Sequence, residues 1–76
     1  MNMEVMNVTK NNIRTKVENC GVLSTEWIPM YSLEKPARLT RYEYNRLRDV
    51  LRTMQADGVV ELDESGVFPY VRRTAR

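Results

Sequence analysis

The chain has 76 residues, the size of a single small domain. It carries 12 Lys and Arg against 10 Asp and Glu, contains no His, and is 42% apolar. This balance is typical of a soluble globular domain, and the absence of His removes the usual general base and the commonest metal ligand. We therefore expect a protein that is not an enzyme and that uses no cofactor, no metal and no small-molecule substrate.

The sequence also indicates a compartment. Cys20 is the only cysteine, so no internal disulfide is possible, whereas small secreted domains usually need such staples. No apolar run approaches the roughly 20 residues that cross a bilayer, and the first residues lack the pattern of a signal peptide. We expect a cytoplasmic protein with no membrane partner.

The N-terminal part predicts a tail followed by a helix. Residues 1–7 show no clear period and are expected to form a flexible tail. Thr9 is a good N-cap, and the apolar stripe Ile13, Val17 and Cys20 follows at helical spacing. Gly21 is placed to end the helix. We therefore expect a helix over about 10–20, with Cys20 as a buried structural thiol.

Residues 22–39 leave alternatives open. Val22 and Leu23 fit either a short strand or a segment packed on the first helix. One-turn helices are possible at 24–28 and at 31–35, although the prolines at both sides restrict them. Trp27, the only Trp, is expected to anchor the core.

The clearest element is a helix over 41–57. Thr40 and Glu43 have the spacing of a capping box, and Gly58 stands where a left-handed residue ends a helix. Its apolar face consists of Tyr44, Leu47, Val50, Leu51 and Met54.

A hairpin follows, with strands at 59–62 and 67–71 around a polar turn at 63–66. Because Pro69 cannot donate to a strand ladder, we expect the second strand to lie at the edge of the sheet. The elements together predict an α+β fold with one domain over 8–73 and a basic end at 74–76.

The charges are polarised along the chain. Nine of the 12 basic residues are Arg, the residue type suited to phosphate, guanine edges and carboxylates. An acidic segment lies between two basic ones and contains Asp57, Glu61, Asp63 and Glu64. The small net charge of +2 therefore hides a polarised surface.

One face of the 41–57 helix carries the sharpest functional pattern. At about 100° per residue, four polar residues fall within about 40° of Arg41 around the helix axis, and no acid lies among them; they are Asn45, Arg48, Arg52 and Gln55. Together with Arg41 they form one stripe. We call this set the polar stripe. Arg, Asn and Gln make the paired contacts that read base edges. The alternative is an ordinary solvated helix face.

The order of elements adds a family likeness. Leu47, Leu51 and Met54 lead to Asp57-Gly58, and a hairpin ending in Arg follows at once. Over about residues 40–73 the chain resembles the recognition helix and wing of winged helix-turn-helix proteins. The resemblance implies a small winged-helix-like domain that binds duplex DNA and regulates transcription, with the polar stripe facing DNA and with Arg72 and Arg73 as phosphate contacts of the wing.

A second interpretation starts from the acidic hairpin turn at 63–66. Winged helix-turn-helix proteins often carry Lys or Arg in this turn. In size and composition the chain resembles small proteins of lytic phages, some of which bind host RNA polymerase. The polar stripe would then meet carboxylates, and Asp63 and Glu64 would meet a basic partner surface. We expect a transcription regulator of bacterial or phage origin whose partner is either duplex DNA or RNA polymerase.

Overall fold

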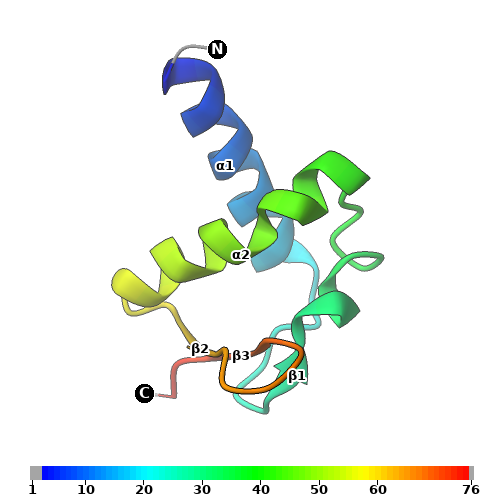
Figure 1. The fold of residues 1–76 in the computed structure, drawn as a ribbon, viewed down its shortest axis with the longest axis vertical. Coiled ribbons are helices and arrows are strands. Elements are labelled where there is room, and N and C mark those ends of the chain that lie inside the picture. The colour runs from blue at the N-terminus through cyan, green and yellow to red at the C-terminus, as the bar shows by residue number, and fades with distance from the viewer. Residues whose placement is uncertain (1–2, 76) are drawn as a thin grey trace.

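The protein is an α+β domain of two helices and one small antiparallel sheet (Figure 1). The computed structural model describes the backbone of residues 3–75 and the side chains of residues 9–75. The elements in chain order are α1 (Met3–Asn19), β1 (Ile28–Pro29), η1 (Met30–Leu33), α2 (Arg41–Ala56), β2 (Val60–Asp63) and β3 (Tyr70–Arg73). This architecture confirms the predicted fold class.

Helix α1 starts earlier than the sequence predicted. It begins at Met3, so Thr9 lies inside the helix and is not its N-cap, and residues 3–7 are helical where a tail was expected. Met and Glu, frequent in this segment, are good helix formers, and a capping residue does not force a helix to begin there. The first two residues of the expected tail lie outside the described part. Gly21 has φ +78°, which confirms its role at the end of the helix.

Residues 22–39 form a strand and a compact helical turn. Of the two possible one-turn helices, the one at 24–28 does not form, because the chain is irregular there and then enters β1. The alternative at 31–35 is close to η1. After η1, the N–H of Leu39 donates to the Glu34 carbonyl and that of Arg38 to the Lys35 carbonyl, both at 3.0 Å. This is a Schellman ending, and Arg38 occupies its left-handed position with φ +55°.

Helix α2 begins and ends where its sequence signals predict. The Thr40 hydroxyl accepts the Glu43 N–H at 3.1 Å, and the Glu43 carboxylate accepts the Thr40 N–H at 2.9 Å, which completes the capping box. At the other end, Val59 and Gly58 donate to the carbonyls of Met54 and Gln55, with Gly58 at φ +78°. The chain therefore turns directly from α2 into the hairpin.

The sheet has the order β1-β3-β2, so the prediction that the second hairpin strand lies at the edge is wrong. Strand β3 begins after Pro69 and pairs on both sides, with Val71 opposite Ile28 in β1 and opposite Leu62 in β2. Pro69 lies before the paired residues of β3, so its missing N–H removes no hydrogen bond from the ladder. Its carbonyl accepts the Met30 N–H at 2.9 Å. Proline stands in an edge strand of this sheet, but it is Pro29 in β1.

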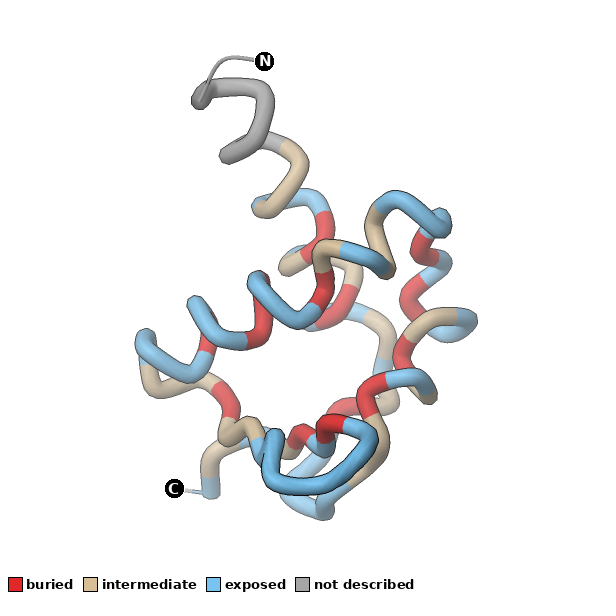
Figure 2. The backbone as a smooth tube through the Cα atoms, viewed as in Figure 1, coloured by how far each residue is buried: buried red, intermediate tan, exposed pale blue. Residues whose placement is uncertain are grey.

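One apolar core lies between α1, α2 and the inner face of the sheet (Figure 2). Its fully buried side chains are Ile13, Val17, Leu33, Leu47, Leu51, Met54, Val60 and Val71. We expected Trp27 to anchor this core, but its side chain is 42% exposed and lies outside it. Cys20 is half-buried at the core margin, where its thiol donates to the Val17 carbonyl at 3.0 Å.

Two ion pairs join α1 to the two ends of α2. The Lys16 Nζ lies 2.9 Å from Glu43 near the start of α2, and an Arg14 Nη lies 2.7 Å from Asp57 just after its end. Both carboxylates are on or next to helix-terminal residues, so the pairs fix the rotation of α2 against α1.

Within residues 3–75, no helix is long and apolar enough to pass through a bilayer.

Leu51→Ala should lower the free energy of unfolding by about 2–5 kcal/mol, because the side chain is fully buried and leaves a cavity. Val67→Ala removes two carbons from a side chain that is 91% exposed and should change stability by less than about 0.5 kcal/mol. Chemical denaturation of both variants measures the difference. Equal midpoints for the two variants would contradict the packing of α2 described above.

Thr40→Ala should lower stability by about 1 kcal/mol, because it removes the hydroxyl that accepts the Glu43 N–H. Thr53→Ala is the matched control within the same helix. The Thr53 hydroxyl donates only to the Asp49 carbonyl at 3.2 Å, and Ala is the better helix former there. A Thr40→Ala variant as stable as Thr53→Ala would show that the capping box contributes nothing.

Candidate functional site

The polar stripe lies on the solvent side of α2, as its spacing predicted. Arg41, Asn45, Arg48, Arg52 and Gln55 are all exposed. They follow one line along the helix because the opposite arc is buried in the core. The structure divides this line into two halves with different surroundings.

The C-terminal half is paired with the hairpin turn. Arg52 donates through two guanidinium nitrogens to the two carboxylate oxygens of Glu64, at 2.8 and 3.2 Å. Arg48 lies 3.5 Å from the same carboxylate. We call this contact the Glu64 clamp. The polar stripe itself contains no acid, but Asp49 beside it on the helix lies 3.6 Å from Arg52, and the tertiary fold adds Glu64 from the hairpin turn.

The clamp has an electrostatic consequence. The hydrogen bonds from Arg52 and the positive charges of Arg52 and Arg48 stabilise the ionised carboxylate, so the pKa of Glu64 lies below its ordinary value. The same contact raises the pKa of Arg52. Much of the positive charge in this half of the stripe is therefore already compensated within the protein.

Gln55 has a structural role that its position in the stripe did not predict. Its side-chain oxygen accepts the N–H of Leu62 at 2.6 Å. Leu62 lies in β2, an edge strand of the sheet, and an edge strand leaves backbone groups unpaired. Gln55 thus ties the sheet edge to α2.

Arg72 and Arg73 also differ from each other. They are neighbours in β3 and point to opposite faces of the sheet. Arg72 forms an ion pair with Glu61 on the adjacent strand, and its guanidinium carbon lies 4.5 Å from the centre of the Trp27 ring. Arg73 is exposed, and its side chain forms no ion pair in the described part of the chain.

The N-terminal half of the stripe adjoins further exposed cations. The sequence analysis placed Arg41 in the stripe but did not include Lys35 or Arg38 among the candidate site residues. Lys35, Arg38 and Arg41 are exposed, and none of them forms an ion pair with another described residue. We call these three residues, which surround the N-terminus of α2, the basic entry. Glu43, the one acid within 35–46, is used by the cap and by Lys16. Glu34, just before this range, is partly exposed and lies within electrostatic reach of Tyr44, as Arg41 does.

The basic entry continues onto the helix. The guanidinium carbon of Arg46 lies 4.6 Å from the centre of the Tyr42 ring, and its Nε is buried without a hydrogen-bond partner. The signal for this region was present in the sequence as a run of cations from Lys35 to Arg46. Only the structure shows that these cations, unlike those near Glu64, form no ion pair with another described residue.

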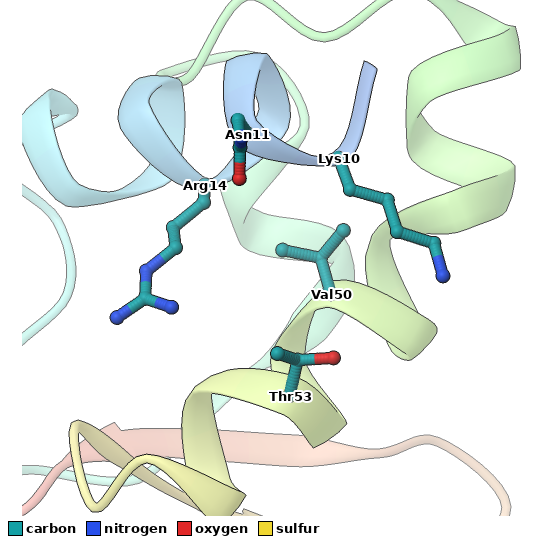
Figure 3. A pocket seen from close by; sticks show the side chains of 5 residues that line it. All are labelled: Lys10, Asn11, Arg14, Val50 and Thr53. Atoms are coloured by element: carbon teal, nitrogen blue, oxygen red, sulfur yellow. The ribbon is translucent and has the colours of Figure 1, made fainter. Parts of the chain in front are cut away.

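A pocket of about 330 Å³ opens between α1 and α2 (Figure 3). Lys10, Asn11 and Arg14 line it from one helix, and Val50 and Thr53 from the other. Arg14 is engaged by Asp57 and Glu18, and no carboxylate or thiol lines the space. Among the described residues, no group of three metal-ligating side chains comes together.

Comparison of the chain with protein-family models, with curated proteins and with solved structures gave no match. The interpretation of the site therefore depends on its own geometry.

The Glu64 clamp can be tested by following the carboxyl of Glu64 in an NMR pH titration. In the wild type its pKa should lie below the ordinary glutamate value, and Arg52→Gln should raise it toward that value. Because the folded pKa is the lower one, the clamp stabilises the fold above the unfolded pKa and loses this effect as pH falls through the folded pKa.

Arg14→Gln is the matched control for this titration. It removes a guanidinium that is also paired with carboxylates, but on the other side of α2. It should leave the pKa of Glu64 unchanged. If Arg52→Gln also leaves that pKa unchanged, the bidentate contact does not form in solution.

Proposed function

We propose that this protein is a non-enzymatic transcription regulator of winged-helix type that binds duplex DNA, with α2 as recognition helix and the β2–β3 hairpin as wing. The setting is the cytoplasm of a bacterium or of a phage-infected cell. The observation that carries the proposal is the basic entry, three exposed cations that form no ion pair with another described residue, at the start of the helix whose polar stripe faces solvent.

The topology agrees with this reading. The chain runs α1–β1–η1–α2–β2–β3, and the two hairpin strands join β1 in the order β1-β3-β2. In the winged-helix resemblance a short helical element precedes the recognition helix, and η1 with its Schellman ending occupies that place. Buried Met30 and Leu33 anchor η1 in the core, so the basic entry is held on a rigid support.

The two halves of the polar stripe receive different roles. Arg41 and Asn45 are free to make paired contacts with base edges in the major groove. Arg48 and Arg52 contact DNA only when phosphates compete with Glu64 for their guanidinium groups. The clamp thus weakens non-specific attraction to phosphate and leaves the reading of bases to the N-terminal half of the helix.

Phosphate contacts come from cations that surround the helix. Lys35 and Arg38 lie before the N-terminus of α2, where backbone N–H groups and the helix dipole also favour an anion. Arg73 contributes from the end of β3, while Arg72 is occupied by Glu61 and Trp27. This assignment keeps Arg73 as a wing contact and removes Arg72.

The backbone of Arg38 gives further support. It holds a left-handed conformation, φ +55°, which glycine adopts without steric cost. A long cationic side chain at a position that favours glycine indicates a role for the side chain itself.

A second candidate function is direct binding to RNA polymerase. It is favoured by the Glu64 clamp, because a stripe whose cations are half-compensated attracts DNA less strongly than the sequence suggested. The basic entry, which includes Arg41, would then meet carboxylates of the polymerase surface.

Arg38→Gly separates function from stability. The variant should be at least as stable as the wild type, since glycine relaxes the left-handed backbone. Its affinity for random-sequence duplex DNA should fall about tenfold, or about 1.4 kcal/mol, and the slope of log affinity against log salt should decrease by about one contact. Fluorescence anisotropy over a salt series measures both quantities.

Lys10→Ala is the control for this experiment. It removes one cation from α1, on the side of α2 opposite the stripe, where Lys10 lines the pocket with Val50. It should change neither the affinity nor the slope. Equal losses for Lys10→Ala and Arg38→Gly would show non-specific attraction. The second candidate would be established by two results together. The protein would show no salt-dependent binding to DNA, and it would bind purified RNA polymerase in a way that Arg41→Ala abolishes.

A further inference from the structure

Large exposed apolar side chains come from neighbouring segments around the sheet: the residue before β1, η1, the β2–β3 loop and β3. Trp27, Tyr31, Phe68 and Tyr70 are between 42% and 56% exposed, and Val67 beside them is 91% exposed. These segments lie together at one end of the molecule (Figure 1). We call these five residues the aromatic face.

The strand register explains why they meet. Val71 is fully buried and marks the inner face of β3, so its neighbours Tyr70 and Arg72 point outward. Tyr70 is paired with Pro29 across the ladder, and the Arg72 guanidinium covers the Trp27 ring. The aromatic side chains thus share the outer surface of the sheet.

The hairpin loop extends this surface. The Met30 N–H donates to the Pro69 carbonyl at 2.9 Å, which holds η1 against the end of the loop. As a result the rings of Tyr31 and Phe68 meet edge to face, with centroids 5.7 Å apart. The contact orders both rings while each stays more than half exposed.

The fold does not need these side chains in its core. The buried cluster does not include them, and several large exposed aromatic side chains at one end of a small domain mark an interaction site. Trp, Tyr and Arg are also the residue types that dominate binding energy at protein interfaces.

The charges around the aromatic face select the partner. Glu61 compensates Arg72. Glu26, next to Trp27, and Asp63, opposite Tyr70 in the ladder, are exposed and have no cationic partner among the described residues. Hydrogen bonds from Ser65 lower the pKa of Asp63 and keep it ionised. Such a rim repels phosphate and attracts Lys and Arg.

We propose that the aromatic face docks a partner protein through an apolar segment flanked by Lys or Arg side chains. This surface is separate from the basic entry and the polar stripe, and the inference does not depend on DNA binding. A molecule with both surfaces links a basic protein segment to whatever α2 binds.

The test is a selection from a random-sequence peptide library displayed on yeast, with the full chain as bait. The selected peptides should combine aliphatic or aromatic residues with Lys or Arg. Tyr31→Ser plus Phe68→Ser should weaken their binding by more than about tenfold, and both substitutions lie outside the strands. Tyr42→Ser is the control, because Tyr42 is 46% exposed on α2, and it should bind the peptides as the wild type does.

Glu26→Lys tests the charge of the rim without touching an aromatic residue. It should weaken the selected peptides at low salt and much less at high salt, because salt screens exposed charges. Circular dichroism confirms that each variant is folded. Peptides that are acidic, or that bind the double variant as well as the wild type, would overturn the proposal. A concentration-dependent dimer that the double variant abolishes would also overturn it, because the occupant would then be a second copy.

Discussion

Burial of the apolar face of α2 holds this protein together. Leu47, Leu51 and Met54 are fully buried, and they join α1 on one side to the sheet on the other. A domain of this size buries only about 60% of the surface of its unfolded chain, so one well-filled helix face carries much of its stability. The capping box and the left-handed Gly58 fix where the helix starts and stops, and therefore which residues face the core.

The position of the hairpin follows from this constraint. Because α2 ends in a Schellman turn and β2 starts at Val60, the hairpin must return along the helix, and its turn reaches the exposed polar stripe. Glu64 then compensates Arg48 and Arg52. The effective charge of the stripe is therefore a property of two elements together, and it is greatest at the N-terminus of the helix, which the turn does not reach.

The sheet separates two surfaces of opposite chemistry. Its inner face completes the core beneath α2, whose N-terminus carries the basic entry, while its outer face exposes the aromatic face with an acidic rim. Arg72 lies on the outer face but adds no net charge there, since Glu61 balances it. A three-stranded sheet can serve both purposes because successive side chains of a strand point to opposite faces.

The sequence by itself determined the elements whose signals are local. Helix α2 was predicted almost to the residue because Thr40 at its start and Gly58 at its end are signals read from neighbouring residues. Tertiary structure decided what depends on residues far apart in the chain. Pro69 precedes a central strand because the paired residues of β3 begin only at Tyr70. Trp27 lies outside the core because its neighbour Ile28 pairs with inward-facing Val71. Glu64 meets the polar stripe because the hairpin folds back. Period and propensity describe one segment at a time, so they carry no information about which distant side chain that segment will meet.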